Sequence, residues 1–347
     1  KKKMFLKSTI LNSTVRNNTF KQMEIIQGTD KRRKMALSEA PVESIFKNTD
    51  DNLVSIKVHF AGINRPDVLQ VKGLYDPPIG HSPIPGLEVS GEIINAAAHT
   101  GYTRGQRVCA LMNGGGYAQY ALCHHHTVLP IPSSLSFKQA ACLPETLFTC
   151  WTNLFQQVNV FGDCTLSKQA SENKGRSVLI HGGSSGIGMS AIALCKAFGV
   201  SNVFTTVGSE EKRNFLNQWW THTLGSNDES QQLHVLNYKQ EAWSSNIAKL
   251  SAADGGVDLV LDMVSGKEYT KHNLDLLRTQ GRLAVIGSLG GVHASVDFRS
   301  VMRKRLTIGG STLRARSTQA KKSIKDDLVQ FVWPKLDKQQ ISFPLDD

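Results

Sequence analysis

The sequence predicts an α/β protein in which a doubly wound parallel sheet is joined to a second, mainly β domain. From Arg176 onward, short apolar segments typical of strands alternate with segments typical of helices, a pattern that indicates a parallel sheet covered by helices on both faces. The first of these strands runs into a glycine-rich turn and then a helix. Before Pro132, short strand-like segments are separated by glycines and prolines, which indicates a mostly β domain.

The N-terminal region carries most of the excess charge. Residues 1–40 contain ten lysines and arginines and three acidic residues, and so account for +7 of the formal net charge of +11. The remainder is only mildly basic and does not indicate a nucleic-acid-binding protein. We expect residues 1–21 to form a disordered basic extension. Because residues 1–23 contain no acidic residue, a mitochondrial transit peptide is the alternative.

The remaining 326 residues have room for two domains, taken here in chain order. The β domain should occupy residues 22–133 and the parallel-sheet domain residues 134–305, with residues 306–347 returning to the β domain. Strands are expected over residues 53–60, 107–112 and 117–122 of the first domain and over 177–180, 202–207, 257–262 and 282–287 of the second, with a long helix over 136–155 and surface insertions at 162–174 and 218–232.

Two further features concern the compartment. No uninterrupted apolar run reaches the roughly 18 residues that a membrane span requires, so no span is expected. The six cysteines are scattered without a C-x-x-C pair, which favours a reducing compartment. We therefore expect a cytoplasmic protein, or a mitochondrial one if the extension is a transit peptide.

The glycine-rich turn HGGSSGIG, residues 181–188, has the features of a dinucleotide-binding turn. We expect Gly183 to permit the tight exit from the strand, Gly186 to let the backbone approach a pyrophosphate, and Gly188 to bring the helix close to the sheet. The helix N-terminus would then offer N–H groups to the anion. The strict G-x-G-x-x-G pattern is not met, because Ser185 occupies the place of the middle glycine.

The same string also fits the spacing of the short-chain dehydrogenases. In that family the turn lies near the N-terminus and a Tyr-x-x-x-Lys pair follows it. Here a whole β domain precedes the turn, and no tyrosine has a lysine four residues on. Position and partners therefore disfavour that family.

A series of motifs along residues 50–317 resembles a different family. The strings AGINRPDVLQVKGLYDPP, PGLEVSGEI, GQRV, GGYAQYAL, LPETLFTCW, VLIHGGSSGIG and LNYK occur in this order. Together they resemble the zinc-free quinone oxidoreductase and zeta-crystallin branch of the medium-chain dehydrogenase/reductases. Because LRARS at residues 313–317 also has a counterpart there, the closest resemblance is to the stress-inducible NADPH quinone oxidoreductases. It implies a Rossmann domain beside a GroES-like catalytic domain.

The residues at the end of the second Rossmann strand determine whether NADPH or NADH binds. Small and basic residues there suit the 2′-phosphate of NADPH, whereas an acidic residue would bind a free ribose hydroxyl. Gly208, Ser209 and Lys212 meet the first description, and the resemblance implies that Lys212 and Tyr238 hold the phosphate. Glu210 and Glu211 would oppose it if they faced inward. The cofactor-binding residues expected are Thr149, Gly183, Ser184, Ser185, Gly186, Ile187, Gly188, Gly208, Ser209, Lys212, Tyr238, Gly287, Ser288 and Leu289.

No metal is expected. The positions that hold zinc ligands in zinc-dependent relatives match Asn64, Leu87 and Glu145, and asparagine and leucine are not zinc ligands. The triplet His124–His126 would lie on a strand, where adjacent side chains point to alternating faces and cannot converge on one ion.

The resemblance implies reduction of a quinone or a related conjugated carbonyl by NADPH, in a cleft whose pocket residues match Asn64 and Tyr75. Such an acceptor needs little beyond a well-placed hydride donor, because proximity supplies most of the acceleration. Two alternatives stay open: a 2-alkenal or enoyl-thioester reductase, and a nucleotide-binding structural or RNA-binding protein of the zeta-crystallin type. A homodimer is expected.

The C-terminal part departs from the family pattern. The chain stops at Asp347, short of the final strand and helix that such proteins carry. We therefore expect the second part of the catalytic domain to be truncated, with Ile341, Phe343 and Leu345 on a strand that lacks a following partner.

Overall fold

The computed structural model describes residues 19–28, 33–46, 50–156, 165–222 and 230–343. The chain forms two compact units. The first contains the described residues up to Phe148 together with Arg314–Asp337, and the second contains Thr149–Leu313 and the described residues from Lys338 on.

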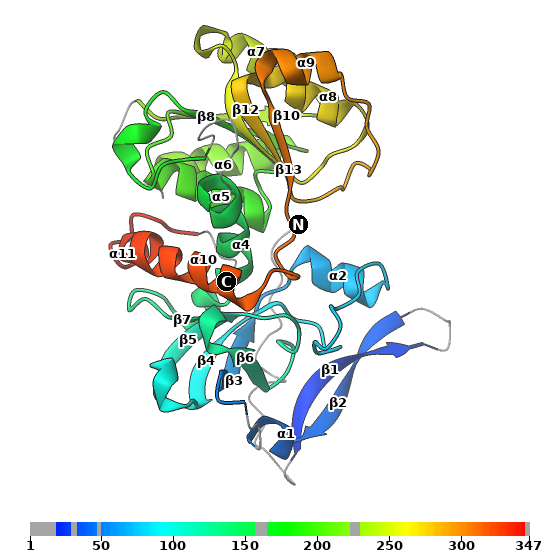
Figure 1. The fold of residues 1–347 in the computed structure, drawn as a ribbon, viewed down its shortest axis with the longest axis vertical. Helices are drawn as coiled ribbons and strands as arrows, with labels where there is room; N and C mark the ends of the chain where they lie inside the picture. Colours follow the sequence, from blue (N-terminus) through cyan, green and yellow to red (C-terminus); the bar gives the residue numbers. More distant parts are fainter. Residues whose placement is uncertain (1–18, 29–32, 47–49, 157–164, 223–229, 344–347) are drawn as a thin grey trace. The chain divides into compact units, whose positions relative to one another are not determined.

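The second unit is built on a six-stranded parallel sheet, as the alternation of segments predicts (Figure 1). The strand order is β10-β9-β8-β11-β12-β13, so the chain starts in the middle of the sheet, moves to one edge, and returns to build the other half. This is the order of a dinucleotide-binding Rossmann sheet. The strands are β8 (Ser177–His181), β9 (Asn202–Val207), β10 (Gln232–Asn237), β11 (Val257–Asp262), β12 (Leu277–Val285) and β13 (Thr307–Gly310).

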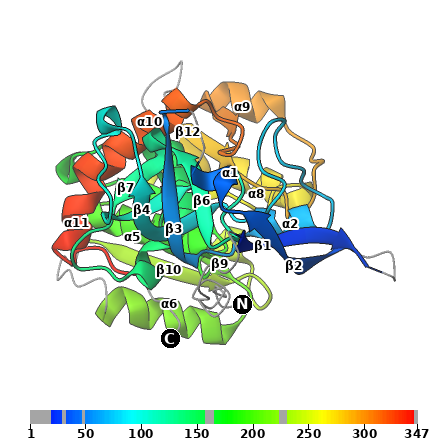
Figure 2. The ribbon, with the colours of Figure 1, turned by 90° about the horizontal axis from the view of Figure 1, so that it is seen from below.

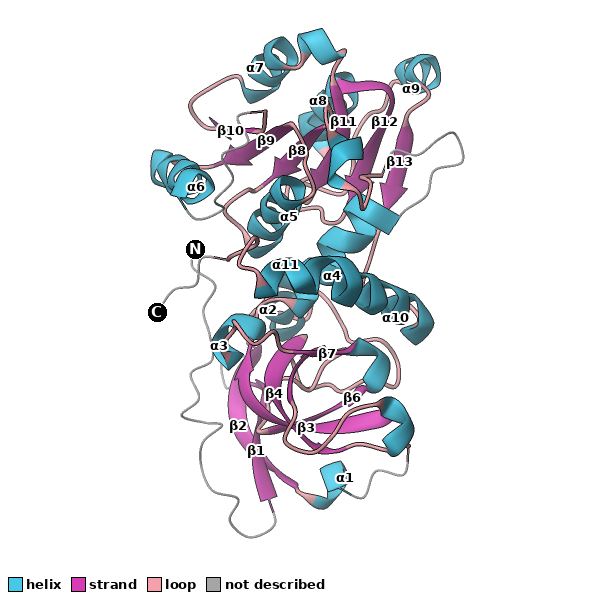
Figure 3. Ribbon diagram, turned by 90° about the vertical axis from the view of Figure 1, so that its left-hand side faces the viewer, coloured by secondary structure: helices cyan, strands magenta, loops and turns pink. Residues whose placement is uncertain are grey.

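Helices flank this sheet (Figure 3). One group, α5 and α6, packs on β8, β9 and β10, whereas α8 and α9 pack on β12. The central strands β8, β9 and β11 are buried along almost their whole length because both faces are covered; β11 is buried throughout. The helices are α5 (Gly186–Ala197), α6 (Glu210–His222), α7 (Trp243–Leu250), α8 (Lys267–Leu276) and α9 (Phe298–Lys304).

Two strands of this sheet were not predicted. β10 follows a segment read as a polar insertion, and its first four residues are not fully buried. β13 is short and alternates between half-buried and exposed residues. Both are edge strands, which need a weaker apolar signal than the buried central strands. The strand expected over residues 282–287 corresponds to β12. The observed strand begins earlier, at Leu277, and ends two residues earlier, at Val285.

The first unit contains a five-stranded antiparallel sheet in the order β6-β3-β4-β5-β7. Alternate residues of the strands, such as Val54, Ile56 and Val58 of β3, form its buried core. The three predicted strands are present, with β6 beginning three residues later than expected. The strands are β3 (Leu53–Ala61), β4 (Glu88–Asn95), β5 (Arg107–Leu111), β6 (Tyr120–His124) and β7 (Val128–Pro130).

A hairpin, β1 (Thr19–Gln27) and β2 (Arg33–Pro41), projects from this unit (Figure 2). It was not predicted, and its first residues overlap the expected basic extension, of which residues 1–18 lie outside the described residues. Backbone hydrogen bonds join Met23 to Tyr117 at 2.8 Å and Gln119 to Lys21 at 2.9 Å. The hairpin is therefore paired with the segment that leads into β6.

The long helix expected over residues 136–155 is interrupted. Helix α3 (Phe137–Ala140) ends before α4 (Pro144–Trp151), and a π-helical turn follows over Thr152–Gln156. Proline disfavours helical backbone at the residue before it and has no N–H, so Pro144 starts a helix rather than continuing one. The other helices of the first unit are α1 (Glu43–Phe46), α2 (Arg65–Val71), α10 (Thr318–Asp327) and α11 (Trp333–Asp337).

The C-terminal segment also differs from the prediction. Residues 341–343 form no strand, although Ile341 is buried; Leu345 lies outside the described residues. Among the described residues, no helix combines the length and apolar character needed to cross a membrane.

The units divide at Phe148/Thr149 and Leu313/Arg314, rather than at residues 134 and 306. The first difference arises because the first half of α4 belongs to the β unit. The second arises because β13 pairs with β12 in the parallel sheet.

Candidate functional site

The glycine-rich turn leaves the carboxyl end of β8, which lies between β9 and β11 at the centre of the sheet. Here the strand order reverses, because the chain goes from β8 to one side and later to the other. Ligands of open parallel sheets bind at this point. The topology therefore places HGGSSGIG where a dinucleotide would be bound.

Three positions of the turn favour glycine, one because of its backbone angle and two because of close contacts. Gly182 has a φ of +68°, so it makes the tight turn that we expected of Gly183. A Cβ on Gly183 would instead lie 2.2 Å from Thr205 Oγ1, so this glycine allows the turn to pack on β9. A Cβ on Gly188 would lie 2.4 Å from the carbonyl oxygen of Gly182. Gly188 thus lets α5 pack closely against the turn.

Helix α5 begins directly after the turn and is capped by Ser185, whose Oγ accepts a hydrogen bond from Gly188 N at 3.0 Å. The earlier N–H groups of the first turn have no acceptor within the helix and are available to an anion. Ser184, Gly186 and Ile187 line this half-exposed turn. Thr149 precedes Cys150, whose thiol lies 3.4 Å from the carbonyl oxygen of Ile187, so Thr149 is next to a residue that touches the turn.

A buried polar chain that the sequence did not reveal supports the turn from below. Asp262 accepts hydrogen bonds from Val264 N, from Ser265 and, at 2.9 Å, from Asn273 Nδ2. Because the amide nitrogen of Asn273 points to Asp262, its oxygen accepts the His181 Nε2–H at 2.7 Å. His181 Nδ1 then accepts the hydroxyl of Thr206 at 3.0 Å.

This chain fixes the tautomer of His181, and burial of the ring favours its neutral form. Complete burial lowers the pKa of His181, against the opposing effect of the Asp262 carboxylate. The Thr206 carbonyl in turn accepts the N–H of Gly183 at 3.0 Å. The ends of β8, β9 and β11 and helix α8 are thereby tied together beneath the glycine turn.

A second glycine-rich segment, residues 287–291, follows strand β12. It lies next to the first glycine-rich turn, and Met263 contacts both. Its sulfur lies 3.6 Å from Ser185 Oγ. Its carbonyl oxygen accepts the N–H of Leu289 at 3.2 Å and lies 3.0 Å from where a Cβ of Gly287 would be. The two glycine-rich loops therefore lie at the same edge of the sheet, because each follows the carboxyl end of a parallel strand. Gly287, Ser288 and Leu289 follow β12, with Ser288 and Leu289 exposed.

At the end of β9, the structure brings together residues that are far apart in the sequence. A Cβ on Gly208 would lie 2.7 Å from the hydroxyl oxygen of Tyr238, so glycine here leaves room for the tyrosine ring in this position. Tyr238 is 43% exposed, and its N–H donates to the Val207 carbonyl at 3.0 Å. Ser209 Oγ accepts the backbone N–H of Lys212 at 3.4 Å. Ser209 directly precedes Glu210, the first residue of α6.

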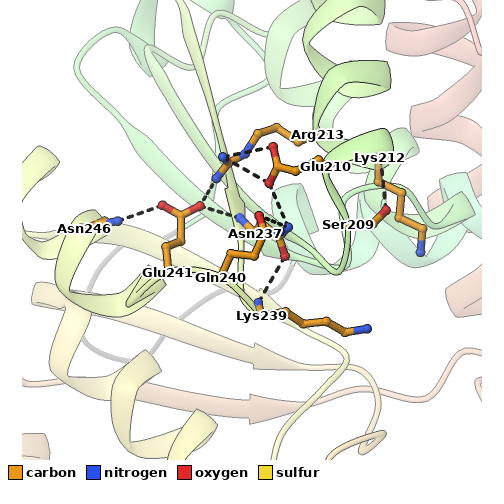
Figure 4. Close-up of polar contacts among 9 residues, drawn as sticks. All are labelled: Ser209, Glu210, Lys212, Arg213, Asn237, Lys239, Gln240, Glu241 and Asn246. Atoms are coloured by element: carbon orange, nitrogen blue, oxygen red, sulfur yellow. Dashed lines mark hydrogen bonds and ion pairs between the residues drawn. The ribbon is translucent and has the colours of Figure 1, made fainter.

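The nearby carboxylates are engaged elsewhere (Figure 4). Glu210 accepts a hydrogen bond from Asn237 Nδ2 at 2.9 Å and lies 3.4 Å from the Arg213 guanidinium. Arg213 also pairs with Glu241, a residue that sequence reasoning missed. Glu211 is exposed. One arginine therefore pairs with two carboxylates on the side of the strand end that faces β10.

The ammonium groups of Lys212 and Lys239 point away from this network (Figure 4). Lys239 follows Tyr238 in the LNYK string and was not singled out from the sequence; its backbone N–H donates to Asn237 Oδ1 at 3.2 Å. Two lysines and a tyrosine hydroxyl thus stand at the strand end. This set of donors suits a phosphate group.

In the first unit, Asn64 is held by a buried carboxylate. Its Nδ2 donates to Glu88 Oε1 at 2.8 Å, and Glu88 Oε2 accepts the backbone N–H of Glu145 at 3.0 Å. Glu88 is fully buried, and Asn64 N donates to Asp67 at the start of α2 at 2.8 Å. Leu87, beside Glu88, is buried. The positions matched to zinc ligands are therefore linked through Glu88, which the sequence did not single out.

Tyr75 lies on the loop after α2, and the guanidinium carbon of Arg314 is 5.5 Å from its ring centroid. Partial burial and, to a lesser extent, the Glu145 carboxylate raise the pKa of Tyr75, whereas Arg314 opposes this. The phenol is therefore neutral at physiological pH. Arg314 donates to the carbonyl oxygen of Asn113 at 2.8 and 3.0 Å and to Gln70 at 3.0 Å. It belongs to the LRARS string and fixes the environment of Tyr75.

The expectation that His124, His125 and His126 point to alternating faces is wrong. Strand β6 ends at His124, and a 3₁₀ turn follows over His125–Thr127. The turn brings the three rings together, and one ligand nitrogen from each lies within 4.8 Å of the others.

Two family models match the chain. A model described as alcohol dehydrogenase GroES-like domain matches residues 50–133, and one described as zinc-binding dehydrogenase matches residues 186–331. The chain is 31% identical to the quinone oxidoreductase of Rattus norvegicus over 280 residues, which is 80% of this chain and 74% of that protein.

Solved structures share the fold at low sequence identity. The structure of CurK enoyl reductase superposes with a TM-score of 0.70 at 22% identity, covering 94% of this chain and 91% of the other. The structure of Escherichia coli quinone oxidoreductase complexed with NADPH superposes with a TM-score of 0.67 at 18% identity, covering 94% and 90%. With the Rossmann turn, the GroES-like sheet and this identity to quinone oxidoreductases, the chain belongs to the quinone oxidoreductase family of the medium-chain dehydrogenase/reductases, and is an oxidoreductase that uses a nicotinamide cofactor.

Proposed function

We propose that this protein reduces quinones or related conjugated carbonyls with NADPH, without zinc. The observation that carries the choice of cofactor is the end of β9. Lys212 and Lys239 present their ammonium groups there (Figure 4), and the Tyr238 hydroxyl lies against Gly208. Arg213 pairs with the carboxylates of Glu210 and Glu241. A bound 2′-phosphate would find cations rather than an acidic residue at this point. The quinone as acceptor is inferred from the relatives, which are named quinone oxidoreductases.

The residues of the second unit fit a dinucleotide. Gly183 and Gly188 are packed so closely that a Cβ would collide with Thr205 or the Gly182 carbonyl, and the first turn of α5 offers its N–H groups to the pyrophosphate. When bound, NADPH supplies the hydride, which with one proton from water converts a quinone to a hydroquinone. The His181–Asn273–Asp262 chain holds the turn in the binding shape and exchanges no proton in the reaction.

In the first unit, Asn64 and Tyr75 would position the acceptor. Glu88 fixes the amide of Asn64, so its rotamer is set before a substrate arrives. The Arg314 guanidinium beside Tyr75 favours hydrogen-bond donation from the phenol to an oxygen that gains negative charge. Neither residue needs to transfer a proton, because water can supply one to the product.

Zinc would have no role in this reaction. Asn64 and Leu87 occupy two of the three positions matched to zinc ligands, and neither is a zinc ligand. Catalytic activity should therefore survive treatment with a chelator. Loss of turnover on chelation, restored by zinc, would contradict this part of the proposal.

A second candidate is the reduction of 2-alkenals or enoyl thioesters, favoured by the superposition on CurK enoyl reductase. The test is a steady-state comparison of kcat/KM for a panel of quinones, enals and enoyl thioesters, each with NADPH and with NADH. We expect the highest value for a quinone with NADPH. A higher value for an enoyl thioester would support the second candidate, and binding of NADPH without turnover of any acceptor would support a nucleotide-binding structural protein.

A further inference from the structure

The three histidines at the end of β6 form a compact cluster of imidazole rings on the first unit. The ring centroids of His124, His125 and His126 lie 4.1 to 4.9 Å apart. One ligand nitrogen from each ring lies within 4.8 Å of the other two. All three side chains are half-buried, so they are held in place and remain open to solvent.

The backbone of this cluster is fixed by hydrogen bonds. His124 pairs with Leu53 in the sheet, and the N–H of His125 donates to the carbonyl oxygen of Asn52 at 2.9 Å. The hydroxyl of Thr127 donates to the carbonyl oxygen of His124 at 3.0 Å. The three rings are therefore presented by a structured turn and not by a free chain, which lowers the entropy lost when a ligand orders them.

The charges around the cluster balance. His124 faces Asp50 and Lys325, and His126 faces Lys325, Lys322 and Asp326. His125 faces Lys325 and His99, whose ring centroid lies 5.6 Å from its own. Two carboxylates thus offset two ammonium groups.

We propose that His124, His125 and His126 together bind one late first-row transition ion, of the class Zn²⁺, Ni²⁺ or Cu²⁺. Imidazole nitrogen is the preferred ligand of these ions, whereas Mg²⁺ and Ca²⁺ require oxygen ligands. Bonds of about 2.0–2.1 Å to nitrogen place two ligands of one ion at most about 4 Å apart, so the rings must move together slightly. His124 Nδ1 accepts the N–H of His126 at 3.1 Å; this nitrogen carries the lone pair, and the ion would replace that hydrogen bond.

The site is distinct from the catalytic chemistry. It does not include Asn64, Leu87 or Glu145, and it is independent of whether the enzyme reduces quinones or enals. An ion here would stabilise the turn against which α10 packs. Activity should not depend on it, so binding is measured directly.

The test is calorimetric titration of the chelator-treated full chain with Zn²⁺ at neutral pH, for the wild type and for the separate variants His125→Gln and His126→Gln. His222→Gln is the matched control, because His222 is an exposed histidine at the end of α6. We expect one ion per wild-type chain. We expect each cluster variant to weaken binding by at least about tenfold, since even a group that only orients a ligand contributes about 10- to 100-fold to affinity.

Two further measurements separate a built site from a run of histidines. Ca²⁺ should give no binding heat, and the wild-type chain unfolded in urea should bind Zn²⁺ more weakly than the folded chain. Circular dichroism of the variants confirms that they fold. Binding of equal strength in the wild type and both cluster variants, or in the folded and unfolded wild type, would overturn the proposal.

Discussion

Lys212 is the side chain on which the choice between NADPH and NADH should depend most. Replacing it by alanine removes a charged donor from the end of β9, which costs about 1.5–3 kcal/mol for a hydrogen bond to a charged group, or roughly ten- to over a hundredfold in affinity. We expect Lys212→Ala to weaken NADPH and leave NADH binding nearly unchanged, as measured by fluorescence titration with both cofactors. Lys249→Ala, at an exposed position of α7, is the control. Equal weakening of both cofactors would contradict the assignment.

Tyr75 should act on the acceptor and not on the cofactor. Its ring lies beside Arg314 in the first unit, so Tyr75→Ala removes a donor and a contact surface for the substrate. We expect turnover to fall by about 10- to 100-fold, which corresponds to about 1.4–2.7 kcal/mol of transition-state stabilisation, with little change in NADPH affinity. The neighbouring exposed residue Leu74 provides the control variant Leu74→Ala. Unchanged turnover in Tyr75→Ala would exclude this role.

At the scale of elements, the junction of the glycine turn and α5 determines cofactor binding. Glycine to alanine within a helix ordinarily gains about 1 kcal/mol in helix propensity. Here the new Cβ would lie 2.4 Å from the Gly182 carbonyl oxygen and 2.6 Å from Gly183 Cα, so the turn must shift. We expect Gly188→Ala to lower the denaturation midpoint and to abolish NADPH binding.

The matched substitution is Gly310→Ala at the end of β13, where a Cβ meets nothing within 4 Å. It should leave both stability and cofactor affinity close to those of the wild type. If Gly188→Ala bound NADPH as tightly as Gly310→Ala, the close packing of α5 on the turn would not be needed for binding.

The elements that the sequence predicted well are those whose pattern is local. Strands β8, β9 and β11 are short segments rich in apolar and β-branched residues, and the turn after β8 has its glycines at fixed spacing. Edge strands β10 and β13 were missed because half-exposed strands carry a weak pattern. The positions of Lys212 and Tyr238 followed from a family resemblance, whereas Gly208 needed the structure to show why it is glycine.

Contacts between distant segments could not be read from the sequence. The pairing of Arg213 with Glu241, and the chain from His181 through Asn273 to Asp262, join residues that lie 11 to 92 positions apart. The histidine triplet was misjudged for a related reason. Its strand ends at His124, one residue before the alternation would have separated the side chains.

At the scale of the whole molecule, histidines with lowered pKa values should make the fold sensitive to acid. Burial lowers the pKa of seven described histidines, so below about pH 6.5 the unfolded chain binds more protons than the folded one. The free energy of unfolding therefore decreases as the pH is lowered. Asp67 opposes this, because burial raises its pKa to about 6 and the folded state then holds its proton more strongly. The histidines are His59, His81, His124, His125, His126, His181 and His234.

Seven groups outweigh one, so we expect the urea midpoint to fall steadily from about pH 7.5 to about pH 5.5. Urea unfolding in the presence of a chelator, which removes any contribution from a bound ion, measures this directly. A midpoint that stays constant or increases as the pH falls over this range would contradict the lowered pKa values of these histidines.

The central claim is that hydride passes from NADPH to a quinone on this protein. The most direct measurement is a single turnover, in which protein carrying stoichiometric NADPH is mixed with excess quinone while the nicotinamide absorbance and the hydroquinone product are followed together. We expect one hydroquinone per NADPH consumed, a slower rate when the transferred hydrogen is deuterium, and no effect of a chelator. A protein that binds NADPH tightly but consumes none of it with any quinone would contradict the claim.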